Sequence, residues 1–282
     1  METMTTNYLS LTPEEKWEQA TLANNFIFYK VMRNHQDACK QLLEMLLGIK
    51  IDSMEMKQEE TIALDYDSKG IRLDVFVKDT GRMFDVELQV ANTKELPERA
   101  RYYQGVMDVD TLKAGQKYKE LRDSHIIFIC LEDVFKNGLP VNTFANICLE
   151  DGKTKFGDRT YKHFFFAPLC AKMIEDKEVK AFFEFLISNQ ASSSYTDELK
   201  NYVADAKQST ENKMQFMTWE RQRAYDLDAG REEGIAIGAQ QKAVEDARSF
   251  YANGASIELI SKSLNMTIEQ VKEIVRDTAV SV

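Results

Sequence analysis

Two acidic side chains on neighbouring predicted strands could together bind a divalent cation. If Thr80 and Gly81 form a two-residue hairpin loop, the antiparallel register sets Asp74 directly opposite Glu87. Opposed residues have Cβ atoms roughly 4.5–5.5 Å apart, and two like charges at that separation destabilise the strand pair unless a cation lies between them. Mg²⁺ meets this need because it binds one or two carboxylates, keeps several waters and leaves positions for a phosphate. The pair therefore predicts a magnesium site that could hydrolyse phosphodiesters.

Other groups on the second strand could complete this site. Because side chains alternate between the two faces of a strand, Asp85, Glu87 and Gln89 share the face opposite to the apolar residues between them. The amide of Gln89 therefore points toward the same site, and the main-chain carbonyl of Leu88 could supply a further oxygen ligand. We interpret Asp85 as solvated rather than as a contact of the site.

A simple solvated face is the alternative to a metal site. Half-buried antiparallel strands ordinarily alternate apolar with polar residues, and a three-residue loop would move Asp74 away from Glu87. The surrounding pattern favours catalysis, because helical segments before and after the strands should cover the sheet. A covered carboxylate pair is costly unless it is paired or bound to a metal.

The elements that must position these residues run in the order α-β-β-β-α-β. Helical spacing, turn residues and apolar runs predict them at 13–47, 61–66, 71–77, 83–90, 96–121 and 124–131. The three strands between the helices read as an antiparallel meander. A further strand pair is expected at residues 142–149 and 161–167.

Strand signals end near residue 170, and the remaining sequence is helical and highly charged. We predict a core domain at 1–170, a charged helical extension at 171–240 and a small helix-turn-helix-like tail at 241–282. Residues 242–282 contain five Lys and Arg against six Asp and Glu. This balance lacks the basic footprint of a DNA-binding tail, so an interaction or dimerisation module is at least as well supported.

The composition sets limits on the class of protein. With 44% hydrophobic and 29% charged residues, 12 Gly and 4 Pro, the chain has a globular composition rather than a disordered one. Its apolar runs are much shorter than the roughly 18 residues of a membrane span, and its first residues lack the pattern of a secretory signal. We therefore expect no membrane partner and a cytoplasmic location.

Cysteine, histidine and net charge restrict the cofactors and partners. The four Cys show no CxxC spacing and the three His show no zinc-binding pattern, so any metal is expected to use oxygen ligands. The formal net charge of −10 has the wrong sign for general coating of nucleic acid. A DNA partner would therefore need a local basic surface.

Several motifs together resemble the PD-(D/E)XK nuclease superfamily. Asp74 is followed on the next predicted strand by Glu87-Leu88-Gln89, after an N-terminal helix and before a long one. More narrowly, the chain resembles the Rpn-like group of recombination-promoting nucleases and transposases in the segments Asn24–Phe28, Arg72–Val75, Asp85–Gln89, Leu96–Gln104 and Ile126–Cys130. The resemblance covers about residues 20–230. It implies an α/β fold with a restriction-endonuclease-like core, in which helices flank a mixed sheet, and a helical C-terminal region.

The resemblance also implies roles for individual residues. Asp74 and Glu87 match the residues that bind Mg²⁺, and Gln89 stands where the superfamily usually has a Lys that positions or activates the attacking water. Gln cannot carry charge as an ammonium does, although it can orient a water by hydrogen bonding. Because Arg fits phosphate oxygens, the following helix offers candidate DNA contacts at Arg99, Arg101, Tyr103 and Gln104.

We therefore expect a Mg²⁺-dependent DNA endonuclease linked to DNA recombination or mobile elements, with no small-molecule cofactor. Paired cuts in duplex DNA would favour a homodimer by symmetry. One alternative is a DNA-binding or regulatory protein that kept the fold and has weak or no catalytic activity. Another is an oligomeric interaction protein that acts through its helical tail.

Overall fold

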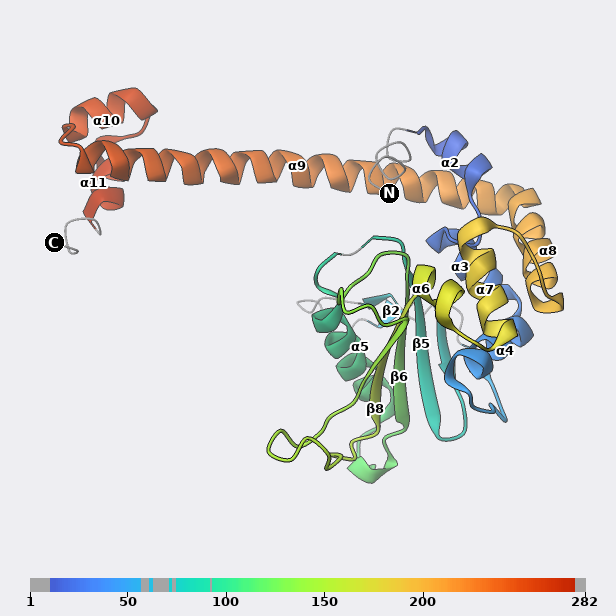
Figure 1. The fold of residues 1–282 in the computed structure, drawn as a ribbon. Coiled ribbons are helices and arrows are strands. Elements are labelled where there is room, and N and C mark those ends of the chain that lie inside the picture. Colours follow the sequence, from blue (N-terminus) through green and yellow to red (C-terminus); the bar gives the residue numbers. More distant parts are fainter. Residues whose placement is uncertain (1–10, 57–60, 63–70, 73–74, 92, 277–282) are drawn as a thin grey trace. The chain divides into compact units, whose positions relative to one another are not determined.

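The computed structural model describes residues 11–56, 61–62, 71–72, 75–91 and 93–276. Its two compact units are residues 1–216 and 217–282. The first unit holds the sheet and the candidate site, and Figure 1 shows the course of the chain. None of the helices in the described part is long and apolar enough to span a membrane.

The N-terminal helical segment consists of three helices, α2 (Pro13–Gln19), α3 (Asn25–Asn34) and α4 (Gln36–Leu47). The capping box of Thr12 and Glu15 starts α2, and the side chain of Asn24 accepts hydrogen bonds from the first turn of α3. Gly48 ends α4 with a φ of 63°, a left-handed conformation that glycine adopts without steric cost.

A mixed sheet forms the centre of the first unit. Its strand order is β1-β4-β5-β6-β8-β7, and β2 and β3 pair separately. The strand bounds are β1 (Glu55–Met56), β2 (Thr61–Ile62), β3 (Ile71–Arg72), β4 (Val75–Lys78), β5 (Arg82–Gln89), β6 (Asp123–Cys130), β7 (Val141–Phe144) and β8 (Thr160–Phe166). The pairs β5–β6 and β6–β8 are parallel, whereas β1–β4, β4–β5 and β7–β8 are antiparallel. The α/β restriction-endonuclease-like fold expected from the sequence is confirmed.

The β4–β5 hairpin has the predicted register. Its pairs include Val75 opposite Val86, and the strands join through the two-residue loop Thr80–Gly81. This register excludes the alternative three-residue loop. Asp74, which was predicted to face Glu87, lies outside the described residues.

The helix after β5 is shorter than predicted. The pattern indicated a helix over 96–121, but α5 (Leu96–Thr111) ends ten residues earlier. The backbone of Leu112 is extended, and Gly115 has a φ of 88° that an α-helix does not tolerate. A short 3-10 helix, η1 (Tyr118–Glu120), then leads into β6.

The helix α5 covers one face of the sheet. Its buried side chains pack with Met83 of β5 and with Ile126 and Phe128 of β6 in one hydrophobic cluster. Seven of the eight residues of β5 are buried, so both faces of this strand are covered. Polar side chains on the face below α5 are therefore removed from water, which raises the free-energy cost of any charge placed there.

Three further helices belong to the first unit: α6 (Ala167–Met173), α7 (Lys177–Ser188) and α8 (Ser194–Gln208). The helix α7 contacts α4, α6 and α8, and α8 also contacts α3. The Tyr195 hydroxyl donates a buried hydrogen bond of 2.8 Å to the carbonyl of Ala38. Because these helices pack on the N-terminal helices, the domain boundary predicted near residue 170 lies inside the first unit.

The second unit ends in a small helical cluster. The long helix α9 (Thr210–Ala252) is followed by α10 (Ile257–Leu264) and α11 (Ile268–Arg276). Ala247, Ile260, Val271 and Val275 form the buried centre of the cluster. The boundary predicted between residues 240 and 241 lies inside α9, since this helix continues without a break from the charged extension into the tail.

Candidate active site

The candidate site lies where β5 ends and α5 begins. Glu87 and Gln89 stand at the end of β5, and Arg99 is in the first turns of α5. On β5 the side chains of residues 83, 85, 87 and 89 point to one face of the sheet, and those of 84, 86 and 88 point to the other. Met83 marks the first face, because it belongs to the hydrophobic cluster below α5. Glu87 and Gln89 therefore point to the face that α5 covers, and they are only 2% and 9% exposed.

Arg99 joins the two predicted site residues of β5. Its Nη2 donates to Oε2 of Glu87 in an ion pair, and its Nη1 donates to Oε1 of Gln89 at 3.0 Å. The Gln89 amide in turn donates to the carbonyl of Ala91 at 2.7 Å. These bonds fix both ends of the Gln89 amide, so the sequence of β5 and the start of α5 build one connected polar network.

Aromatic rings hold the guanidinium of Arg99 in place. Its central carbon lies 5.2 Å from the ring centroid of Tyr103 and 5.3 Å from that of Phe128. Such contacts stabilise a cation over the ring faces. Burial is the largest single effect and lowers the pKa of Arg99, but the charge and hydrogen bonding of Glu87 and Tyr103 together outweigh it and raise the pKa above its usual value. The guanidinium therefore stays charged beside the carboxylate.

Two other reactive side chains near Glu87 and Gln89 are held in their neutral forms. Burial, together with the negative charge of Glu87, raises the pKa of Tyr103. Burial also raises the pKa of Cys130, the partner of Gln89 on β6, to about 12. Neither side chain forms the anion that a covalent nucleophile needs at neutral pH.

The interpretation of Asp85 as solvated is wrong. Its side chain is fully buried at 0% exposure and pairs across the sheet with Phe76 and Ile126, both in the cluster below α5. The alternation of apolar and polar residues is typical of a half-buried strand, but here a helix covers the polar face as well. A second buried carboxylate therefore stands two residues from Glu87.

The remaining predicted site residues differ in their exposure to solvent. Arg101 is exposed, whereas Tyr103 and Gln104 are buried, and the Gln104 amide donates to the carboxylate of Asp108 at 3.3 Å. The Leu88 side chain is buried on the opposite face of β5, so only its main-chain carbonyl could serve as a ligand. The structure thus brings Arg99 to Glu87 and Gln89. The phosphate contacts of Arg101, Tyr103 and Gln104 stay predictions.

The donor chemistry of the site suits a hard cation. Among the described residues, no group of three or more His, Cys, Asp or Glu side chains could hold a metal ion. Magnesium does not need such a group, since one or two carboxylates with waters and substrate phosphates are sufficient. Glu87 offers a carboxylate, Gln89 an amide oxygen and Leu88 a carbonyl, all of them oxygen donors. The residues present therefore fit Mg²⁺ rather than zinc.

Two histidines that are distant in the sequence meet on parallel strands. The Nδ1 of His125 lies 3.0 Å from the Nε2 of His163, and the Nδ1 of His163 lies 3.1 Å from the hydroxyl of Thr143. Burial lowers the pKa of both imidazoles to about 4, so both are neutral at physiological pH. Local sequence patterns could not reveal this pair, because the crossover from β6 to β8 creates it.

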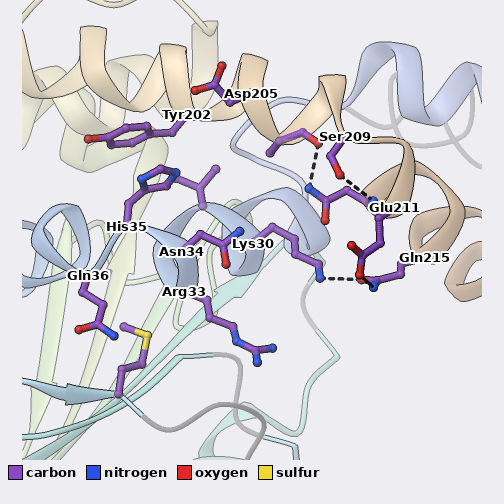
Figure 2. Close-up of a pocket in the computed structure, with 14 residues that line it drawn as sticks. Lys30, Arg33, Asn34, His35, Gln36, Tyr202, Asp205, Ser209, Glu211 and Gln215 are labelled. Atoms are coloured by element: carbon purple, nitrogen blue, oxygen red, sulfur yellow. Dashed lines mark hydrogen bonds between the residues drawn. The ribbon is translucent and has the colours of Figure 1, made fainter.

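A pocket of about 540 Å³ lies apart from Glu87, Gln89 and Arg99. It lies between α3, α8 and the start of α9, and Figure 2 shows its polar lining. The Lys30 ammonium donates to the Gln215 amide oxygen at 2.6 Å, and the ring of His35 stacks on Tyr202 with centroids 3.5 Å apart. Of the residues proposed for metal or phosphate binding, none that the structure describes lines this pocket.

Comparison with known proteins identifies one family. A family model described as PD-(D/E)XK nuclease family transposase matches residues 24–249. This match includes the whole sheet, α5 and all the predicted site residues. No curated protein matches the chain, and no solved structure matches it.

Proposed function

Because the chain belongs to the PD-(D/E)XK nuclease family transposases, we propose that it is a Mg²⁺-dependent DNA endonuclease. In this proposal Asp74 and Glu87 hold the metal, with the main-chain carbonyl of Leu88 as a further ligand. The observation that carries the proposal is the buried network of Glu87, Gln89 and Arg99 at the junction of β5 and α5. The β4–β5 register, in which Val75 lies opposite Val86, supports the expectation from the sequence that Asp74 faces Glu87.

Each group of the chain has a defined task in this reaction. When bound, Mg²⁺ would lower the pKa of a water molecule and neutralise charge on the phosphate. Gln89 would orient the attacking water, because Arg99 and Ala91 fix its amide and each end of an amide can make a second hydrogen bond. The helix α5 covers the carboxylate and limits the access of bulk water, which strengthens electrostatic interactions inside the site.

The arginines of α5 are the proposed contacts with DNA. Arg99 and the exposed Arg101 would bind phosphates, and Tyr103 and Gln104 are proposed as neighbouring contacts. A link to recombination or mobile elements, a homodimeric assembly and a cytoplasmic location complete the proposal. A second candidate is a DNA-binding protein with weak or no cleavage activity, which is favoured by the uncharged Gln89 at the position of the usual Lys.

Plasmid cleavage distinguishes these two functions. We expect supercoiled DNA to be nicked or linearised by the wild-type protein in Mg²⁺, but not in EDTA and not by Asp74→Ala in either buffer. Equal cleavage by both forms would mean that a contaminating nuclease is responsible, and the endonuclease proposal would then be wrong. DNA binding without cleavage would support the second candidate, and no binding at low salt would exclude both.

A further inference from the structure

We propose that Arg99 couples metal binding to DNA binding, because it exchanges its contact with Glu87 for a contact with a DNA phosphate. The inference rests on the proposed function and concerns the same site. It assigns Arg99 a positioning role beyond that of a phosphate contact: the residue controls when the Glu87 carboxylate can accept the metal.

The first step is the competition for Glu87. Arg99 donates to Oε2 of Glu87, a carboxylate whose side chain is only 3% exposed. A divalent cation bound there would need lone pairs of the same carboxylate, and it would lie close to a guanidinium of like charge. The interior around the carboxylate screens that repulsion weakly. The ion pair seen in the structure therefore opposes metal binding.

The second step is the ability of Arg99 to leave this contact. Its side chain is 29% exposed, so it reaches the surface from the buried carboxylate. Its Nε is buried and has no hydrogen-bond partner in the described part of the chain. A guanidinium binds phosphate best when two of its N–H groups donate in parallel. A move toward a phosphate would satisfy Nε, which the contact with Glu87 leaves without a bond.

The third step is the consequence for binding. If a DNA phosphate draws Arg99 away from Glu87, the carboxylate becomes available and the metal binds more tightly. Thermodynamic linkage then requires that the metal tighten DNA binding by the same factor. The chain would load its metal mainly on DNA, because both ligands displace the same ion pair.

Two variants with the same change in charge test this coupling. Arg99→Gln removes the ion pair, and Arg101→Gln is the matched control at an exposed position of the same helix. Mn²⁺ binding to the DNA-free proteins is measured by electron paramagnetic resonance. Binding of a labelled DNA duplex is measured by fluorescence anisotropy in Ca²⁺ and in EDTA at equal ionic strength.

We expect Arg99→Gln to bind Mn²⁺ on the order of tenfold more tightly than wild type. Arg101→Gln should have the wild-type affinity for Mn²⁺, but it should bind DNA more weakly in both buffers because it loses a proposed phosphate contact. Ca²⁺ should tighten DNA binding by a similar factor in wild type and Arg101→Gln, but hardly at all in Arg99→Gln. The side chain of Lys is shorter and cannot bridge Glu87 and Gln89 in the same way. We therefore expect Arg99→Lys to have a Mn²⁺ affinity and an effect of Ca²⁺ on DNA binding between those of wild type and Arg99→Gln. Arg99→Lys replaces Arg99→Gln if the latter does not fold.

Two results would overturn the coupling. Unchanged or weaker Mn²⁺ binding by Arg99→Gln, with the effect of Ca²⁺ on DNA binding retained, would show that Arg99 does not control the metal site. The proposed endonuclease function would survive that result. Failure of wild type and all variants to bind Mn²⁺ would instead remove the metal site itself, and both proposals would then be wrong.

Discussion

Replacement of Glu87 by Gln should reduce Mg²⁺-dependent DNA cleavage by about 10³-fold or more. Gln keeps the size of the side chain but removes the negative charge that would hold the cation. A bound metal supplies several kcal/mol of transition-state stabilisation, and each 1.36 kcal/mol corresponds to tenfold in rate. Initial rates of plasmid nicking in Mg²⁺ measure the effect.

A matched control separates this loss from a general change in α5 or in net charge. Glu98→Gln makes the same chemical change at an exposed position in the first turn of α5. We expect it to cleave at nearly the wild-type rate, and circular dichroism should show that both variants are folded. If Glu87→Gln retained cleavage within tenfold of wild type, Glu87 would not be a metal ligand.

Replacement of Phe128 by Ala should lower the free energy of unfolding by about 3–5 kcal/mol, because it removes a large side chain from a packed core. Phe128 is fully buried at 0% exposure, and its ring stacks on Phe164 with centroids 5.2 Å apart. It pairs with Glu87 in the β5–β6 register and lies under the guanidinium of Arg99. The substitution therefore also removes a support of the candidate site.

Denaturant unfolding followed by far-ultraviolet circular dichroism measures this loss. The matched control is Phe156→Ala, since Phe156 is 76% exposed and its truncation should change the free energy of unfolding by at most about 0.5 kcal/mol. Equal stability of the two variants would contradict the packing of α5 against the sheet. A smaller loss of about 1 kcal/mol would mean that the core closes around the missing ring.

The parts of the fold set by local chemistry could be predicted from the sequence. The hairpin is an example, because Thr80–Gly81 and the alternation of residues on both sides determine its register. The apolar run of β6 is another, since buried parallel strands have continuous hydrophobic sequences. The end of α5 could not be predicted in the same way. Its helix-favouring residues continue to 121, but the chain turns at Gly115.

The parts set by long-range packing could not be predicted. The sequence around Asp85 does not show which helix covers β5. The burial of Asp85 depends on the packing of α5 over this strand. Packing between distant segments also sets the extent of the first unit. The helix α8 contacts α3, and Tyr195 of α8 donates a hydrogen bond to the carbonyl of Ala38 in α4. The sequence did single out Arg99. The contact of Arg99 with Glu87, rather than with solvent, could not be predicted because it depends on the packing of α5 on the sheet.

Anomalous diffraction from crystals of the protein bound to a DNA duplex, grown in Mn²⁺, tests the metal site most directly. Mn²⁺ accepts the same hard oxygen ligands as Mg²⁺, and its anomalous signal distinguishes it from water. We predict a peak about 2 Å from a carboxylate oxygen of Glu87, with Asp74 as the second protein carboxylate. The absence of a peak at Glu87, from crystals in which Mn²⁺ binds elsewhere on the protein, would contradict the proposed nuclease centre.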